Sequence, residues 1–148
     1  MVVTTDRAPP STPETSRRMR RVRQKDTTAE AALRRALFAR GLRYRLQVAV
    51  LSKPRRLADI AFIGARVAVF VDGCFWHGCP AHATWPKSNA EFWRAKIRAN
   101  QQRDLDTSAR LREEGWVVVR VWSHEEPSRA AARIEGIVRS RRQAKESA

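Results

Sequence analysis

The stretch ARVAVFVDGCFWHGCPAH, residues 65–82, joins an apolar strand to a short loop that is rich in cysteine and histidine. Residues 65–72 are apolar on both faces. A strand of this kind is buried on both sides, so we expect it at the centre of a sheet. The loop that follows holds both cysteines of the chain and two of its three histidines. A core strand therefore leads directly into the side chains with the richest chemistry.

The sequence around this strand predicts an α/β fold. Alternating or apolar runs predict further strands at residues 42–50, 55–63 and 116–122. Capping signals predict three helices. The first, at residues 27–41, begins with a capping box of Thr27 and Glu30 and ends at Gly41. The second, at residues 87–115, begins with Ser88 and Glu91 and ends at Gly115, and the third, at residues 128–143, begins at Ser128. The order helix, three strands, helix, strand, helix describes a small mixed sheet flanked by helices.

The charge of the chain indicates a polyanionic partner. The chain has 30 Lys and Arg residues against 15 Asp and Glu residues, which gives a net charge of +15. Its length of 148 residues is enough for one domain. Residues 1–16 are poor in apolar side chains and are expected to form a disordered tail, with another tail at 143–148. The domain at 17–142 starts with a basic arm, 17–26, suited to a phosphate backbone through Arg20, Arg21, Arg23 and Lys25. The alternative is that the charge only keeps the protein soluble.

The chain carries no signal for a membrane. It lacks an apolar run of the roughly 20 residues that cross a bilayer, and its first residues lack an apolar signal core. We therefore expect a cytoplasmic protein, in which a pair of cysteines serves a metal or a reaction more often than a disulfide.

The cysteine-rich loop predicts a structural zinc site. Cys74, Cys79 and His82 follow the pattern C-x4-C-x2-H, which supplies thiolate and imidazole ligands at short spacing. His124 directly follows the strand at 116–122 and would reach the same edge of the sheet if that strand is a neighbour of 65–72. Four protein ligands leave no open position for a substrate. The alternative is two buried cysteines with exposed histidines.

A few acidic residues stand where they could serve catalysis. Asp59 lies among apolar neighbours in a strand, where an ionised carboxylate needs a partner or a metal, and it is our candidate Mg²⁺ ligand. Asp72 ends the next strand, and Glu30 would face inward from the first helix. His77, not needed for zinc, has a pKa suited to proton transfer near neutral pH. The alternatives are an Asp59 paired with a nearby arginine such as Arg56 and a His77 exposed without function.

The aromatic residues near the loop offer a contact to bases. Phe75 and Trp76 are adjacent, so at least one of them points away from the core, and Trp93 follows in the next helix. Aromatic side chains beside a basic arm can stack on bases or wedge between base steps. Core packing is the alternative.

Four segments resemble, in order and spacing, the very short patch repair (Vsr) endonucleases. The resemblance extends from about residue 16 to 142. The segments are RMRRVRQKDTTAEAALRRALFARGLRYR at 18–45, ADIAFIGARVAVFVDGCFWHGCPAH at 58–82, PKSNAEFWRAKIRANQQRD at 86–104 and LREEGWVVVRVWSHE at 111–125.

The resemblance implies a restriction-endonuclease-like fold with a particular activity. It implies a Mg²⁺-dependent enzyme that nicks double-stranded DNA 5′ to the mismatched thymine of a T:G pair, the product of 5-methylcytosine deamination. It further implies Mg²⁺ held by Asp59 and the main-chain carbonyl of Val71, with Glu30 nearby and His77 in proton transfer. The implied zinc ligands are Cys74, Cys79, His82 and His124, and the implied DNA wedge is Phe75, Trp76 and Trp93, with the basic arm across the minor groove.

Two alternatives to this function remain. One is a restriction-like endonuclease with another DNA target, and the other is a zinc-containing DNA-binding module without catalysis. We expect a monomer, because a mismatch has no two-fold symmetry that would match a dimer.

Overall fold

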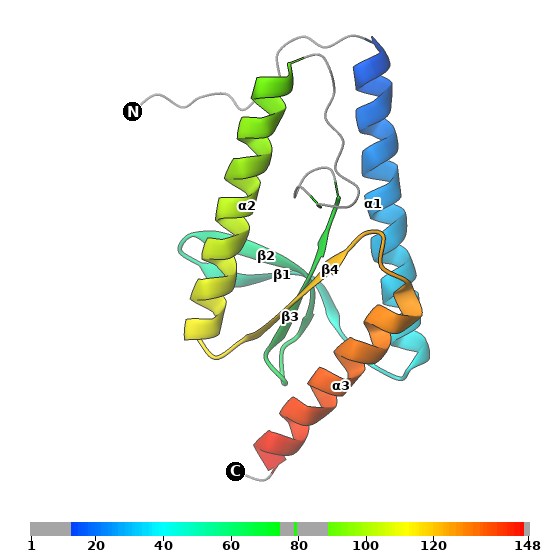
Figure 1. Cartoon of the computed structure of the whole chain (residues 1–148). Coiled ribbons are helices and arrows are strands. Elements are labelled where there is room, and N and C mark those ends of the chain that lie inside the picture. The colour runs from blue at the N-terminus through cyan, green and yellow to red at the C-terminus, as the bar shows by residue number, and fades with distance from the viewer. Residues whose placement is uncertain (1–12, 75–78, 80–88, 147–148) are drawn as a thin grey trace.

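The computed structural model describes residues 13–74, 79 and 89–146. Phe75, Trp76, His77 and His82 lie outside the described residues. The elements follow in the predicted order (Figure 1). They are α1 (Pro13–Ala39), β1 (Arg45–Ser52), β2 (Arg55–Phe62), β3 (Val67–Asp72), α2 (Ala90–Glu113), β4 (Val117–Trp122) and α3 (Pro127–Glu146).

The four strands form one mixed sheet in the order β1-β2-β3-β4. The pairs β1–β2 and β2–β3 are antiparallel, and β3–β4 is parallel, with Val69 opposite Val119. A parallel pair needs a crossover, which is supplied here by the segment that contains α2. The prediction that the strand at 65–72 is central is confirmed, because β3 has a neighbour on each side and Val67, Ala68 and Val69 are fully buried.

Helices cover both faces of the sheet (Figure 1). On one face, Leu33 and Leu37 of α1 and Ile134 and Val138 of α3 pack with the apolar side chains of the central strands. On the other face, Leu111 of α2 packs over a second apolar cluster. The α/β sandwich of a mixed sheet between helices is therefore confirmed. Within the described residues, no helix is both long and apolar enough to cross a membrane.

The first helix begins earlier than predicted. It starts at Pro13, so residues 13–16 are helical, although they were expected in the tail, and so is the basic arm at 17–26. Thr27 does not cap it, because it lies inside the helix, and the Oγ1 of Thr28 donates to the carbonyl of Gln24 one turn earlier. Buried contacts stabilise this extension, since Met19 packs with Trp93 and Ile97 of α2.

Two further helix starts differ from the prediction, whereas two helix ends agree. The N-cap of α2 is Asn89, in the left-handed conformation, and Ser88 lies outside the described residues. Ser128 does not cap α3, because the carboxylate of Glu126 accepts hydrogen bonds from the main-chain N–H groups of residues 128 and 129. Gly41 and Gly115 have φ of 80° and 88°, the left-handed conformation that ends helices.

The last helix extends past its predicted end. It continues to Glu146, so most of the expected tail at 143–148 is helical. Lys145 donates to the carbonyl of Gly64 at 2.7 Å, and Arg141 donates to the carbonyls of Ala65 and Gly115. These side chains tie the end of α3 to the turns beside the sheet.

Candidate functional site

Two carboxylates from different elements lie close together at one side of the sheet. Asp59 comes from β2 and Glu30 from α1. Gln47 of β1 lies near both acids, and its Nε2 donates to Oδ1 of Asp59 at 3.4 Å. Burial of Glu30 and, next, the negative charge of Asp59 raise the pKa of Glu30. The structure thus brings Glu30 and Asp59 near each other.

The carboxylate of Asp59 also fixes the main chain of the central strand. Its Oδ2 accepts a hydrogen bond from the main-chain N–H of Val71 at 2.7 Å. On β2, the residues that pair with β3 are Ile60, Ala61 and Phe62. At the next residue, Asp59, the side-chain carboxylate takes the place of a strand carbonyl as the hydrogen-bond acceptor. The main chain of Val71 therefore lies beside Asp59.

The alternative partner of Asp59 is engaged elsewhere. The Nε of Arg56 donates to Oγ1 of Thr107 on α2 at 2.9 Å, and its guanidinium lies 3.7 Å from Asp106. Within the described residues, no ion pair joins Asp59 to Arg56.

Asp72 is directed to the other helical layer. Its side chain is buried, with 6% of the residue exposed, and its carboxylate accepts two hydrogen bonds from Arg120 at 3.0 and 3.2 Å. Arg120 also donates to Ser108 and the carbonyl of Asp104 in α2. The grouping of Asp72 with the other two acids, expected from its place at the strand end, is corrected. A strand alternates its side chains, and here the arginine of the neighbouring strand neutralises this carboxylate.

The amino-acid sequence did not indicate that Gln47 lies beside the two acids. Its φ of 49° lies in the left-handed region, which is unusual for a residue other than glycine in a strand. A single glutamine in an alternating run gives no such signal, and only the backbone and the contacts of its amide reveal it.

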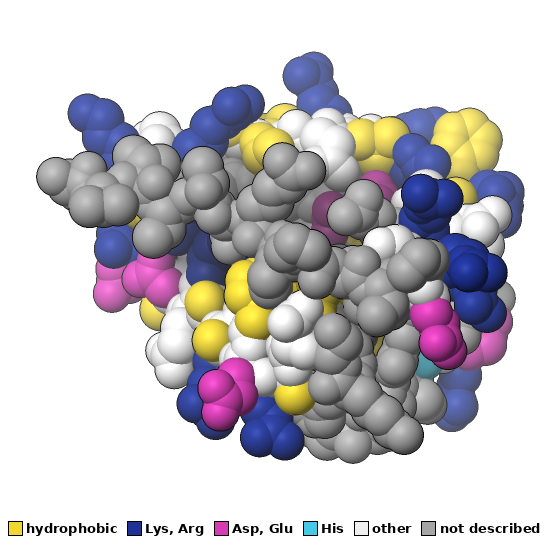
Figure 2. Space-filling model, turned by 90° about the horizontal axis from the view of Figure 1, so that it is seen from above, with side chains coloured by type: hydrophobic (Ala, Val, Ile, Leu, Met, Phe, Trp, Pro, Cys, Tyr) yellow, Lys and Arg dark blue, Asp and Glu magenta, His cyan; other side chains and the backbone are white. Residues whose placement is uncertain are grey.

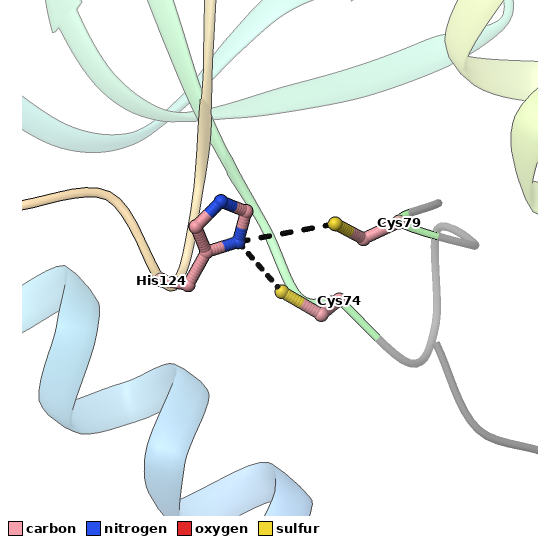
Figure 3. Close-up of side chains that lie close together, drawn as sticks. All are labelled: Cys74, Cys79 and His124. Carbon is pink, nitrogen blue, oxygen red and sulfur yellow. Dashed lines mark hydrogen bonds between the residues drawn. The ribbon is translucent and has the colours of Figure 1, made fainter. Parts of the chain in front are cut away.

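A cluster of sulfur and nitrogen ligands lies at the end of the sheet (Figure 3). The Nδ1 of His124 is 3.1 Å from Sγ of Cys74 and 3.9 Å from Sγ of Cys79, and the ligand atoms of all three lie within 4.8 Å of one another. The parallel pairing of β3 and β4 brings them together, as the sequence predicted. The fourth predicted ligand, His82, lies outside the described residues.

The cluster fits a soft, tetrahedral metal such as zinc. Thiolate and imidazole are its usual protein ligands, and the three ligand atoms are close enough to share one ion. Burial raises the pKa of the Cys74 thiol, with the nearby Cys79 adding to the effect. Without a cation the thiol is therefore held neutral, whereas a bound cation favours the thiolate.

The predicted DNA contacts fall into three groups. Trp93 is 5% exposed and packs with Met19, Ile97 and Phe92, so the expectation of an exposed wedge at this position is corrected. Arg20 and Arg21 are exposed on α1. Nothing is described for the side chains of Arg23 and Lys25, or for Phe75 and Trp76. Lys and Arg side chains surround the end of the molecule at which α1 and α2 begin (Figure 2).

Comparison with known proteins identifies the family. The family model described as DNA mismatch endonuclease Vsr matches residues 10–82. The type II nicking enzyme V.NaeI of Lentzea aerocolonigenes is 46% identical over 125 residues, which are 80% of this chain and 73% of the relative. The type II nicking enzyme V.NmeDIP of Neisseria meningitidis serogroup C is 43% identical over 122 residues, 77% of each chain.

A further relative carries the name of the family itself. The DNA mismatch endonuclease Vsr of Escherichia coli (strain K12) is 38% identical over 108 residues, which are 72% of this chain and 67% of the relative. These identities extend well beyond the loop with the cysteines and cover most of both proteins. The chain therefore belongs to the Vsr family of DNA mismatch endonucleases, and it is a hydrolase that nicks DNA.

Proposed function

We propose that this enzyme nicks double-stranded DNA 5′ to the mismatched thymine of T:G pairs that arise from 5-methylcytosine deamination, in very short patch repair, with Mg²⁺ as cofactor. The observation that carries the proposal is the pair of carboxylates, Glu30 and Asp59, which lie near enough for the charge of Asp59 to raise the pKa of Glu30, in a chain of this family. The mixed sheet between helices, with a carboxylate on its second strand, supports a restriction-endonuclease-like fold.

The residues at this site fit Mg²⁺, which prefers hard oxygen ligands. Asp59 and Glu30 would supply carboxylate oxygens, and Val71 would supply its main-chain carbonyl. The metal would neutralise charge that develops on the scissile phosphate. Burial and, next, the negative charge of Asp59 raise the pKa of Glu30, so a cation placed between the two acids would favour the ionised form of Glu30.

Side chains of the enzyme would carry out the proton transfer and make the contacts with DNA. His77 would move a proton at the attacking water, and its replacement by alanine is expected to lower turnover by about 10²-fold, the usual effect of losing a general acid or base. Phe75 and Trp76 would wedge beside the mismatch, and the exposed arginines of α1 would contact phosphates. Asp72 would position the loop of the zinc cluster through Arg120.

Zinc would be structural, held by Cys74, Cys79, His124 and His82. The three described ligands converge at the mouth of the loop that carries His77, so the metal would fix this loop on the sheet. We propose a monomer that acts in the bacterial cytoplasm at the nucleoid.

A second candidate is the same nicking chemistry on another DNA target. Two relatives are named type II nicking enzymes, without mention of a mismatch, and these names favour the second candidate. Purified protein with Mg²⁺ is incubated with end-labelled T:G, U:G and matched T:A duplexes in varied flanking sequence, and each cut is mapped. We expect a single nick 5′ to the mismatched thymine of T:G. Equal cutting of the matched duplex would contradict the proposal and support the second candidate.

A further inference from the structure

Gln47 occupies a special place between the two acids. In the antiparallel pair of β1 and β2, Leu46 is opposite Ile60 and Val48 is opposite Ala58, which sets Gln47 opposite Asp59. Its Nε2 donates to Oδ1 of Asp59 at 3.4 Å, and its side chain is near enough to Glu30 to oppose part of the rise in the pKa of that acid. One neutral side chain therefore lies next to two like charges that come from different elements.

The backbone at Gln47 points to the same conclusion. Its φ of 49° is disfavoured for a side chain with a Cβ, and such conformations persist where the surroundings hold them, often at functional sites. Glycine would adopt this backbone more readily. The strained backbone of Gln47 and the place of its amide beside two acids together indicate a role for this amide.

We propose that Gln47 is a positioning residue that presets Glu30 and Asp59 for one divalent cation, an inference that rests on the proposed Mg²⁺ site. The NH₂ group donates to Asp59 and, next to Glu30, offsets part of the repulsion between the two acids in the metal-free enzyme. It also orients the carboxylate of Asp59, whose other oxygen is fixed by the N–H of Val71. Partners that orient metal ligands in this way commonly contribute 10–100-fold to metal affinity, an order-of-magnitude range.

The test distinguishes the effect of the Gln47 amide from the effect of the backbone conformation at this position. The variant Gln47→Gly removes the amide but suits a φ of 49°, so it is expected to fold with an unchanged or higher melting temperature. Asn89→Gly is the matched control, because Asn89 also has a left-handed backbone, with φ of 59°, and makes no side-chain capping bond. Mg²⁺ binding is measured by calorimetry on the zinc-loaded proteins without DNA, and nicking is measured across Mg²⁺ concentrations.

We expect Gln47→Gly to weaken Mg²⁺ binding about tenfold and to raise the Mg²⁺ concentration for half-maximal nicking by a similar factor. Asn89→Gly should leave both unchanged. Unchanged Mg²⁺ binding and nicking in Gln47→Gly, together with lost binding in Asp59→Asn, would overturn the role of Gln47 and leave the Mg²⁺ site intact. Wild-type Mg²⁺ binding in Asp59→Asn would instead refute the proposed site.

Discussion

The Nδ1 atom of His124 lies 3.1 Å from the Sγ atom of Cys74, although the two residues are fifty positions apart in the chain. The parallel pairing of β3 and β4 produces this contact, because both strands then end at the same edge of the sheet. Asp72, which precedes the loop, is fixed there by Arg120 of β4. The geometry of the sheet thus assembles the cluster, and a metal would add a bond between segments that the sheet has already brought together.

Removal of the metal is expected to destabilise the fold. Cys79→Ser should lower the zinc content from one ion per chain towards zero and lower the melting temperature, because metal binding to a closed site contributes to the free energy of unfolding. Ser123→Ala is the control, since Ser123 lies 3.5 Å from the Cys74 sulfur but is not a proposed ligand. Zinc content is measured by elemental analysis and melting by calorimetry. Equal melting temperatures with and without a chelator would contradict the structural role of zinc.

Contacts of the exposed arginines with DNA should depend on salt. Arg20→Ala and Arg21→Ala are each expected to weaken binding to matched and mismatched duplexes equally, and to reduce the slope of log K against log salt by about one. Arg139→Ala on α3 is the control, because this exposed side chain pairs with Glu135 of the same helix. Fluorescence anisotropy across a salt series gives the slopes. A loss confined to the mismatched duplex would show that these side chains read the mismatch instead.

The docking of α1 against α2 should depend on Met19. This side chain is buried against Trp93 and Ile97, so Met19→Ala is expected to lower the free energy of unfolding by about 2 kcal/mol. Leu105→Ala is the control, because Leu105 is 66% exposed. Urea denaturation followed by circular dichroism measures both. If the two variants lost the same small amount, the N-terminal half of α1 would not be docked as described.

The stability cost of the acidic pair should depend on pH. Burial raises the pKa of Glu30 in the folded state, so the folded protein binds this proton more tightly than the unfolded chain does. The protonated form therefore stabilises the fold at pH below its ordinary value, and this stabilisation is lost as pH rises through the folded-state pKa. In metal-free protein, Glu30→Gln should raise the melting temperature at pH 7, with a gain that shrinks near pH 4.

The control for this comparison is Glu113→Gln, an exposed carboxylate at the end of α2. Melting temperatures of the three proteins are compared between pH 4 and pH 8. A gain in Glu30→Gln that is the same at every pH would show that the ionisation of Glu30 does not limit stability.

The sequence allowed the sheet and the metal cluster to be predicted for physical reasons. The run at 65–72 is apolar on both faces, and only the interior of the sheet accommodates such a strand. His124 was placed beside the cysteines because neighbouring strands that end at one edge bring their following loops together. Gly41 and Gly115 mark helix ends through their own backbone preference.

Other features depend on tertiary contacts that local patterns do not encode. The helical start at Pro13 is stabilised by the packing of Met19 on Trp93, two residues far apart in the chain. The same contact buries Trp93, which looked like a surface aromatic. The pairing of Asp72 with Arg120 requires knowledge of which strand lies beside β3 and in which register. The left-handed Gln47 has no signature in the sequence.

We propose that Asp59 holds the catalytic cation, and single-turnover nicking of a T:G duplex by Asp59→Asn is the sharpest test of this role. Several kcal/mol of charge stabilisation would be lost, so we expect nicking to fall by about a thousandfold or more. Affinity for the mismatched duplex should stay close to that of wild type. Asp106→Asn, which alters a partly exposed acid paired with Arg110, should nick normally. Nicking by Asp59→Asn at the wild-type rate would contradict the account.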